Sequence, residues 1–317
     1  MELRTLRYFL TVAREQNISA AAESLHISQP ALSTQLKAME EELGKQLLIR
    51  GTKGSRKVVL TEEGMILRKR AEEILSLVQK AEDEITHSDE TIVGDVVIGA
   101  GETDNVRLLA QAARDLQKQY PDIHYHISSG NAEYVLEYLD KGLIDFGLLF
   151  RKPDKKKYEW LPLPVVDTWG VLMRRDAPLA RKAVIRPEDL WELPLIISHQ
   201  KGEDHRLAQW MRRARLELNV VATYNLVFNA SLLVDEGLGY ALCFDKLIHT
   251  DGTNLCFRPF SPILESPCYI AWKKYQIFSK AAGRFLQSVQ KVISVQPSGN
   301  EVAAFDPGHS AFLEEDI

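Results

Sequence analysis

The sequence predicts a chain with two fold classes, a mainly helical segment over residues 1–91 and an α/β segment over residues 92–295. In the first segment, apolar residues recur every three or four positions from Leu3 to Ile85, which is the spacing of amphipathic helices. In the second, apolar runs of strand length alternate with helical patterns, which is typical of α/β folds. The 317 residues exceed what one hydrophobic core generally serves, so two or three folding units are expected.

The composition is ordinary for a globular protein, with 45% hydrophobic and 26% charged residues. No apolar run approaches the length that crosses a bilayer, and Met1 leads into an amphipathic pattern instead of a signal peptide. We therefore expect a cytoplasmic protein with no membrane partner. Cys243, Cys256 and Cys268 form no CxxC pair, so we expect reduced cysteines in the core, no metal site and no cofactor.

Three short helices are predicted at the start of the chain. Residues 3–15 have apolar positions at helical spacing, and Ser19 predicts the N-cap of a short helix over residues 20–25. Ser28, with Pro30 in the first turn, predicts the start of a third helix. The residues that this third helix carries inward are expected to be Leu32, Leu36 and Met39.

Two helices separated by a tight turn, the second opening with small polar side chains, form the helix-turn-helix arrangement. The net charge of −5 does not favour nucleic acid binding, yet residues 44–60 contain basic side chains and no acid. Residues 50–57, followed by the apolar run 58–60, predict a basic hairpin, or wing, that can bind phosphates. The alternative is a solvated charged face on an ordinary three-helix unit. The predicted DNA contacts are Ser28, Gln29, Pro30, Ser33, Thr34, Lys37, Arg50, Lys53, Arg56 and Lys57.

Residues 1–64 resemble the N-terminal signature of LysR-type transcriptional regulators without a gap. Matching segments include Ala21-Ala22, Ser28-Gln29-Pro30-Ala31, Leu43-Gly44 and Leu60-Thr61-Glu62-Glu63-Gly64. Met39 and Leu48 depart from the leucine and phenylalanine usual in the family, and both changes affect packing only. The resemblance implies a DNA-binding transcription regulator that senses a small-molecule effector and alters promoter binding or bending. Its implied partners are double-stranded promoter DNA, the effector and, additionally, RNA polymerase.

A long helix is predicted after Thr61, a suitable cap with acidic residues in the following turn. Apolar residues then recur in steps of four and three, as in a coiled-coil seam. In the family this helix pairs with a second subunit, which implies a homodimer, and the sensing lobes imply a homotetramer. The alternative is a helix that lies on its own domain. The seam residues are Leu67, Ala71, Ile74, Val78, Ala81 and Ile85.

The α/β part resembles the sensing domain of the family, a two-lobed fold like that of periplasmic binding proteins. This match is weaker and depends on segments such as residues 94–99, 140–145, 176–180 and 236–239. The predicted division of the chain is a winged helix-turn-helix over 1–60, a linker helix with a hinge over 61–91, a first effector-binding lobe from 92–163 and 267–295, a second lobe from 164–266, and a mobile tail over 296–317.

Small ligands in such sheets bind beyond the carboxyl ends of strands, where helix N-termini offer free N–H groups. Each predicted residue there could instead be only a helix cap. Glu102 and Asp104 either stabilise a helix start or favour an effector that carries an amine. His124 and His126 share a strand face but lack a third ligand for a metal. The predicted effector contacts are Thr103, Ser129, Asn131, Ser198, Gln200 and Asn229.

Two other classes of function fit the α/β pattern. An enzyme would need a nucleophile with its base, a set of metal ligands or a phosphate-binding glycine loop, and Gly99-Ala100-Gly101 lacks the rest of a dinucleotide fingerprint. A solute-binding protein would have a signal peptide and no basic wing. We therefore expect a regulator that is not an enzyme.

Overall fold

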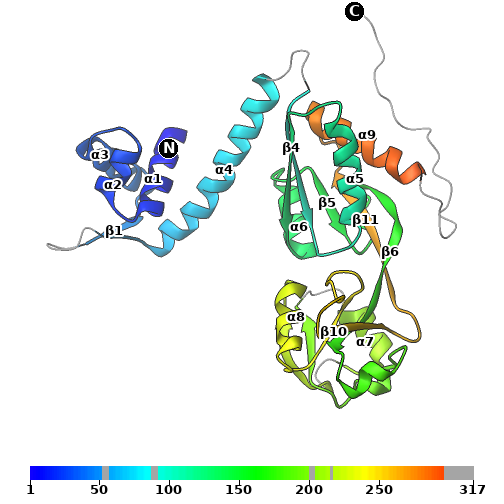
Figure 1. Ribbon diagram of the computed structural model, residues 1–317. Helices are drawn as coiled ribbons and strands as arrows, with labels where there is room; N and C mark the ends of the chain where they lie inside the picture. The colour runs from blue at the N-terminus through cyan, green and yellow to red at the C-terminus, as the bar shows by residue number, and fades with distance from the viewer. Residues whose placement is uncertain (52–56, 87–91, 200–203, 215–216, 296–317) are drawn as a thin grey trace, which may run out of the picture. The chain divides into compact units, whose positions relative to one another are not determined.

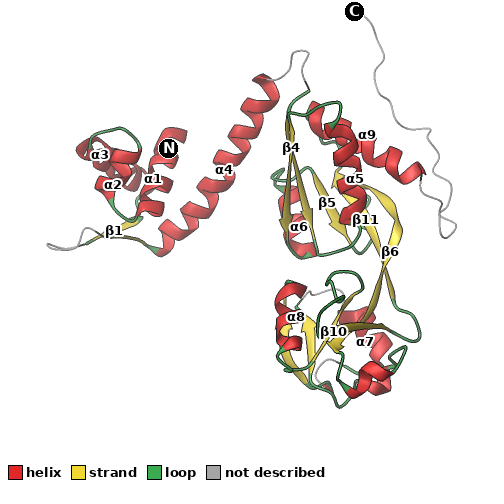
Figure 2. Cartoon of the chain, viewed as in Figure 1, coloured by secondary structure: helices red, strands yellow, loops and turns green. Residues whose placement is uncertain are grey.

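A computed structural model describes residues 1–51, 57–86, 92–199, 204–214 and 217–295. The chain separates into two compact units, which divide after Gly94. The first unit is helical with one small hairpin, and the second is α/β (Figures 1 and 2). Among the described residues, no helix is long and apolar enough to cross a membrane.

The first unit opens with α1 (Leu3–Glu15) and α2 (Ile18–Ser24), which pack around the fully buried Phe9. The prediction that Ser19 caps α2 is wrong. Asn17 is the N-cap, and its side chain accepts from the backbone N–H of Ser19 at 2.9 Å. Both residue types are good caps, and the extended backbone of Asn17 places its oxygen below the first turn.

Helix α3 (Gln29–Leu43) follows a turn in which His26 adopts a left-handed φ of 54°. The prediction for the start of α3 is confirmed, because the Ser28 hydroxyl accepts from the Ala31 N–H at 3.4 Å and Pro30 lies in the first turn. The predicted inward residues are all buried, namely Leu32, Leu36 and Met39. The helix ends at Gly44, which has a φ of 64° that glycine adopts without strain.

The predicted hairpin is present as β1 (Leu48–Arg50) paired antiparallel with β2 (Val58–Leu60). A hydrogen bond from Gly51 N–H to the Lys57 carbonyl at 3.1 Å continues the pairing toward the tip. The Val58 N–H donates to the Gln16 carbonyl at 2.8 Å, which ties the wing to the end of α1. The predicted contacts Lys53 and Arg56 lie outside the described residues.

Helix α4 (Glu62–Thr86) begins as predicted. The Thr61 hydroxyl accepts from Gly64 N–H at 3.0 Å and donates to the Gln46 carbonyl at 2.7 Å. A side chain at Gly64 would collide with the Leu47 carbonyl oxygen, so glycine permits this close approach.

The predicted seam along α4 does not form one continuous face for a partner. Ala71 is fully buried in the core of the first unit, and Leu67 and Ile74 pack against that core. The first half of the seam therefore packs on its own unit, and pairing of this helix with a second subunit stays a prediction. The second half differs, because Ile85 is 75% exposed.

The second unit contains one sheet with the strand order β4-β3-β5-β11-β6-β9-β7-β8, with β10 paired to β6. Its first lobe consists of β3 (Gly94–Ala100), β4 (Ile123–Ser129) and β5 (Phe146–Leu149), with helices α5 (Val106–Gln117), α6 (Ala132–Asp140) and α9 (Lys280–Val295).

Strand β5 lies between two helical layers of the first lobe. A side chain at Gly147 would collide with Val135 of α6, whereas the ring of Phe146 packs at 5.6 Å from Phe285 of α9. Burial on both faces explains why β5 is apolar without alternation. Ser288 of α9 also donates to the Ala112 carbonyl of α5 at 2.9 Å, which joins the two helices on that face.

The second lobe surrounds the other half of the sheet (Figure 1). Its strands are β7 (Leu195–Ser198), β8 (Val220–Tyr224), β9 (Tyr240–Phe244) and β10 (Leu255–Pro259), and its helices are α7 (Asp204–Met211), α8 (Val227–Asp235) and two short 3-10 helices, Pro178–Arg181 and Pro187–Asp189. Strand β7 pairs parallel with both β8 and β9, so three strand ends point to the same edge.

Two long strands run through both lobes. Strand β6 (Tyr158–Arg174) pairs antiparallel with β11 (Glu265–Lys273) and, further on, with β9 and β10. Strand β6 contains Pro162 and Pro164, residues that seldom occur inside a strand, and it continues through both. The predicted division at residue 163 therefore falls inside a continuous strand.

Candidate nucleic-acid interface and effector cleft

The first half of α3 presents polar side chains on one exposed face. Gln29, Thr34 and Lys37 are exposed, and Ser33 is half-buried. Gln29 Nε2 donates to Ser33 Oγ at 3.0 Å, and Thr34 Oγ1 donates to the Pro30 carbonyl at 2.9 Å. The structure thus brings these predicted contacts together on one helix. Exposed hydrogen bonds of this kind exchange readily for bonds to base edges.

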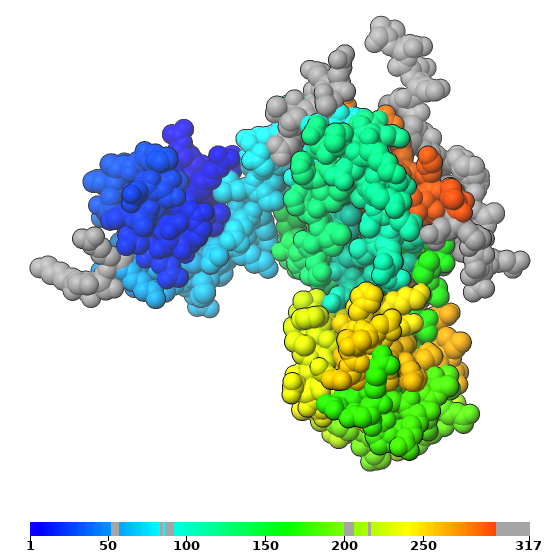
Figure 3. Space-filling view, viewed as in Figure 1, coloured from blue at the N-terminus to red at the C-terminus, as the bar shows by residue number. Residues whose placement is uncertain are grey.

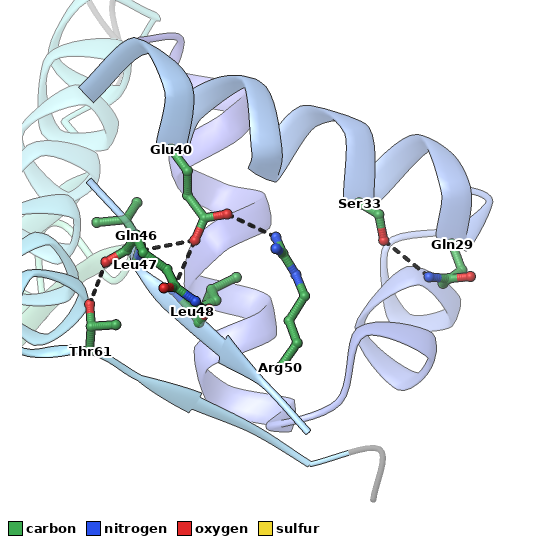
Figure 4. A network of polar contacts seen from close by, with 8 residues as sticks. All are labelled: Gln29, Ser33, Glu40, Gln46, Leu47, Leu48, Arg50 and Thr61. Carbon is green, nitrogen blue, oxygen red and sulfur yellow. Dashed lines mark hydrogen bonds and ion pairs between the residues drawn. The ribbon is translucent and has the colours of Figure 1, made fainter. Parts of the chain in front are cut away.

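Glu40 organises the passage from α3 into the wing (Figure 4). Its Oε1 accepts from the N–H groups of Leu47 at 2.8 Å and Leu48 at 3.0 Å, and its Oε2 accepts from Arg50 at 2.9 Å. The Glu40 side chain is only 12% exposed. Arg50, predicted from sequence as a DNA contact, therefore has an ion-pair partner, and the sequence analysis missed Glu40.

Between the lobes, the loop after β3 is bonded to strand β6. Thr103 Oγ1 donates to Asp167 Oδ2 at 2.6 Å, and Asn105 Nδ2 donates to the same oxygen at 3.0 Å. All three residues are buried, with exposed fractions of 6% for Thr103, 3% for Asp167 and 1% for Asn105. Burial raises the pKa of Asp167, although these hydrogen bonds oppose the shift. The Thr103 hydroxyl thus has an internal partner, and its assignment to the effector stays a prediction.

A second interlobe contact joins Glu102 to helix α8. The Val227 N–H, the first of the helix, donates to Glu102 Oε2. Partial burial raises the pKa of Glu102, and the bond from Val227 opposes the rise. The surfaces of the two lobes meet in the space-filling view, teal against yellow (Figure 3). Glu102 does accept from the first N–H of a helix, as one of the two predictions for it stated, but this helix is α8 of the other lobe.

Aromatic rings also cross from lobe to lobe. Phe150, at the end of β5, lies 5.1 Å from Phe244 at the end of β9, measured between ring centroids. Phe244 lies 4.5 Å from Trp169, whose indole N–H donates to Ser266 Oγ at 3.0 Å. A side chain at Gly101 would approach Phe150 to 2.8 Å, so it would force the ring to shift.

The other predicted effector residues lie at strand or helix ends. Asn131 caps α6 by accepting from the Tyr134 N–H at 2.8 Å, and the exposed Ser129 ends β4. Ser198 ends β7 and is half-buried, and Asn229 is exposed in the first turn of α8. Gln200 lies outside the described residues.

The loop after β4 lies beside the end of β3 in the first lobe. Gly130 N–H donates to the Ala100 carbonyl at 2.9 Å, which sets the loop after β4 beside the end of β3. Two surface hollows lie elsewhere, one along residues 182–189 and one between α5 and α9. None of the predicted effector residues lines either hollow.

Thiol and metal chemistry find no support in the described residues. Cys243, Cys256 and Cys268 are buried and unpaired, as predicted. Burial raises the pKa of Cys243 to about 12, which suppresses the reactive thiolate. His126 Nε2 lies 3.2 Å from Asp95, and no group of three metal-binding side chains occurs in the described part of the chain.

Comparison with known proteins gives matches along both units. Residues 3–65 match the family model of bacterial regulatory helix-turn-helix proteins of the lysR family, and residues 90–294 match that of the LysR substrate binding domain. The chain is 28% identical over 295 residues to the HTH-type transcriptional regulator BsdA of Bacillus subtilis (strain 168), covering 90% of this chain and 99% of the relative. It is 27% identical to the HTH-type transcriptional regulator BudR of Raoultella terrigena, with 90% and 99% covered.

Solved structures show the same fold. The crystal structure of CbnR, a LysR family transcriptional regulator, superposes with a TM-score of 0.72 at 20% identity and covers 92% of this chain and 99% of its own. Full-length CbnR complexed with its target DNA gives the same TM-score at 21% identity, with 92% and 100% covered. With a helix-turn-helix, a wing and a two-lobed substrate-binding domain, the chain belongs to the LysR family of DNA-binding transcription regulators.

Proposed function

We propose that the chain reads promoter DNA with the first half of α3 and with the wing, and that a small molecule in the interlobe cleft alters this binding. The observation that carries the proposal is the exposed polar face of α3, which Glu40 and Arg50 fix relative to the wing. CbnR, which shares the fold, is described in complex with its target DNA, and this supports the same role here.

The side chains on α3 suit two kinds of DNA contact. Gln29 and Ser33 offer neutral donors and acceptors, which read base edges in the major groove. Lys37 offers a cation, which binds phosphate without regard to sequence. Ser28 and Pro30 begin the helix and set how closely its first turn approaches the DNA. The wing contributes Lys53, Arg56 and Lys57 to phosphate binding in this proposal.

The proposal includes assembly from identical chains. On α4, Met65, Ile66, Leu77 and Ile85 remain exposed, and large apolar side chains in such numbers favour a partner helix. On α8, Phe228 and Leu232 are more than half exposed one helical turn apart. We assign the α4 surface to a homodimer and the α8 surface to pairing of dimers into a homotetramer. Chromosomal DNA as the target implies a cytoplasmic protein.

The effector in this proposal lies between the lobes, among Ser129, Asn131, Ser198, Gln200 and Asn229. The described ones among these residues end strands or begin helices on both sides of the β6 crossing, where a ligand could hydrogen bond to both lobes. An effector alters DNA binding only when it binds two arrangements of the lobes with different affinity. Glu102 and Asp167 fix one such arrangement through their hydrogen bonds between the lobes.

Peroxide sensing through cysteine is not part of the proposal. A relative in Pectobacterium carotovorum subsp. carotovorum, 30% identical over 60% of this chain and 62% of its own length, is named a hydrogen peroxide-inducible genes activator. Thiol oxidation needs an accessible thiolate, whereas all three cysteines here are buried and burial holds the pKa values of Cys243 and Cys268 well above the ordinary range.

The test is direct DNA selection with purified protein. A random DNA library is selected at low salt, and the affinity of the recovered site is then measured by fluorescence anisotropy over a salt series. We expect a recovered consensus and a steep loss of affinity with salt, since each neutralised phosphate releases a counterion. Lys53→Ala and Arg56→Ala should weaken all DNA sequences alike. Recovery of no DNA at low salt would contradict the proposed function.

A further inference from the structure

Helix α8 begins without a capping side chain of its own. Its N-cap is Leu226, which makes no side-chain hydrogen bond to the helix. The N–H groups of a first turn lack partners within the helix and carry a partial positive charge, so a carboxylate stabilises them. Here the carboxylate comes from Glu102, 125 residues earlier and in the other lobe.

The loop that carries Glu102 is fixed in place. The next residue, Thr103, bonds to Asp167 of β6 at 2.6 Å and accepts from the Asn105 N–H at 3.0 Å. Glu102 therefore reaches α8 from a loop that is itself held by buried hydrogen bonds. This arrangement differs from a surface carboxylate that meets a neighbouring helix by chance.

Among the described residues, Glu102 has no cationic partner. In the described part of the chain neither Glu102 nor Asp167 takes part in an ion pair, whereas the nearby Asp104 is paired with Arg107. A ligand that brought a second anion to the start of α8 would meet this negative charge and would find the N–H of Val227 already bonded.

We propose that Glu102 is a built-in occupant of the anion position at the start of α8, which ties the lobes together without effector and excludes acidic effectors from that position. The inference deepens the proposed effector site and rests on it. The effector class that follows is one whose group facing α8 carries no negative charge. Phe228 and Leu232, which we assign to the pairing of dimers into a tetramer, lie on the same helix whose first N–H bonds to Glu102.

Hydrogen exchange on the full-length protein tests the tie between the lobes. Glu102→Ala removes the acceptor and its charge, Glu102→Gln keeps an oxygen acceptor without the charge, and Asp122→Ala removes an exposed charge elsewhere in the first lobe. We expect amides 227–229 to exchange about tenfold faster or more in Glu102→Ala, less so in Glu102→Gln, and unchanged in Asp122→Ala. Unchanged exchange of these amides in Glu102→Ala would overturn the proposal.

Anion binding tests the exclusion. Succinate and inorganic phosphate are titrated by calorimetry at constant ionic strength into the parent and the same variants. Glu102→Ala should bind one of these anions about tenfold tighter or more than the parent, while Asp122→Ala, with the same change in charge, should match the parent. Equal anion affinity in parent and Glu102→Ala would overturn the proposal. DNA affinity of the parent is measured alongside, and loss of DNA binding by the parent would count against the proposed function alone.

Discussion

Glu40 and Arg50 form an ion pair at 2.9 Å that connects the middle of α3 to the first strand of the wing (Figure 4). The same carboxylate accepts two backbone N–H groups at the start of β1. One side chain thereby sets the direction in which the chain leaves α3. The reading helix and the wing, which contact DNA separately, are positioned relative to each other by this carboxylate.

Glu40→Ala should destabilise the DNA-binding unit. The substitution leaves two N–H groups and a half-buried guanidinium without their acceptor, which costs about 1–3 kcal/mol of unfolding free energy. Urea denaturation measures the unfolding free energy, and fluorescence anisotropy measures the affinity for DNA. Glu41→Ala, at the exposed next position of the same helix, is the matched control and should change neither. Equal stability of Glu40→Ala and the parent would show that the network contributes nothing.

Local signals in the sequence predicted the helix starts well. Ser28 with Pro30, and Thr61 with its following acidic turn, act within three or four residues, so their effect is readable from the chain alone. The three N-terminal helices and the hairpin of the wing were predicted for the same reason. The exception within this range is α2, where Asn17 and Ser19 are both good caps and only the backbone path decides between them.

Contacts between distant residues could not be predicted in this way. Thr103 and Asp167 are 64 positions apart, and Glu102 and Val227 are 125 apart. Nothing in the spacing of these residues indicates that they meet, since their contact depends on how β6 passes between the lobes. The resemblance to the family predicted an effector site between the lobes, but it did not indicate these two carboxylate contacts. The heptad spacing of α4 likewise could not tell a partner helix from the helix's own head.

Gln29→Ala and Lys37→Ala should affect DNA binding differently. Gln29 is assigned to base edges, so its removal should relax the preferred sequence as well as lower affinity, at about 1–3 kcal/mol for a good contact. Lys37 is assigned to phosphate, so its removal should weaken all DNA sequences alike and reduce the salt slope by about one. Selection from a random library reports the change in preferred sequence, and anisotropy over a salt series reports the change in salt slope. An unchanged consensus with Gln29→Ala would remove Gln29 from the reading surface.

Ile74→Glu and Leu77→Glu should separate head packing from dimer formation. Ile74 packs on the core of its own head, so a charge there should lower the unfolding free energy of the unit by several kcal/mol. Leu77 is 40% exposed, so Leu77→Glu should weaken the dimer while the head stays folded. Circular dichroism melts report the first effect, and sedimentation velocity reports the second. A dimer of undiminished affinity with Leu77→Glu and Ile85→Glu together would place the interface elsewhere.

Asn229→Ala is a cleaner test of effector binding than Thr103→Val. The Asn229 side chain is exposed and makes no cap bond, so its loss should leave the fold intact and weaken only the response to effector. Thr103→Val removes a donor from the buried Asp167 and should cost about 1–3 kcal/mol of stability. Melting curves and reporter assays are compared for both variants. A normal effector response from Asn229→Ala would remove this residue from the site.

Asp167 should make the stability of the sensing domain fall as the pH rises. Burial raises the pKa of Asp167 in the folded state above its unfolded value, so the folded state holds the proton more tightly. The resulting stabilisation is fully present below the unfolded pKa, about 3.9, and is lost as the pH rises through the higher folded pKa. Urea unfolding of the full chain, followed by tryptophan fluorescence from pH 4 upward in steps of about half a unit, measures the slope.

Asp167→Asn should flatten this pH dependence, because the amide cannot ionise while its oxygen still accepts from Thr103 or Asn105. Glu102, whose pKa burial also raises, contributes in the same direction, so some of the slope should remain in Asp167→Asn and disappear only when Glu102→Gln is added. Asp122→Asn, at an exposed position, controls for the loss of one charge. The same slope in the parent and in the double variant would mean that neither carboxylate is linked to folding, and the pair would then owe its position to hydrogen bonding alone.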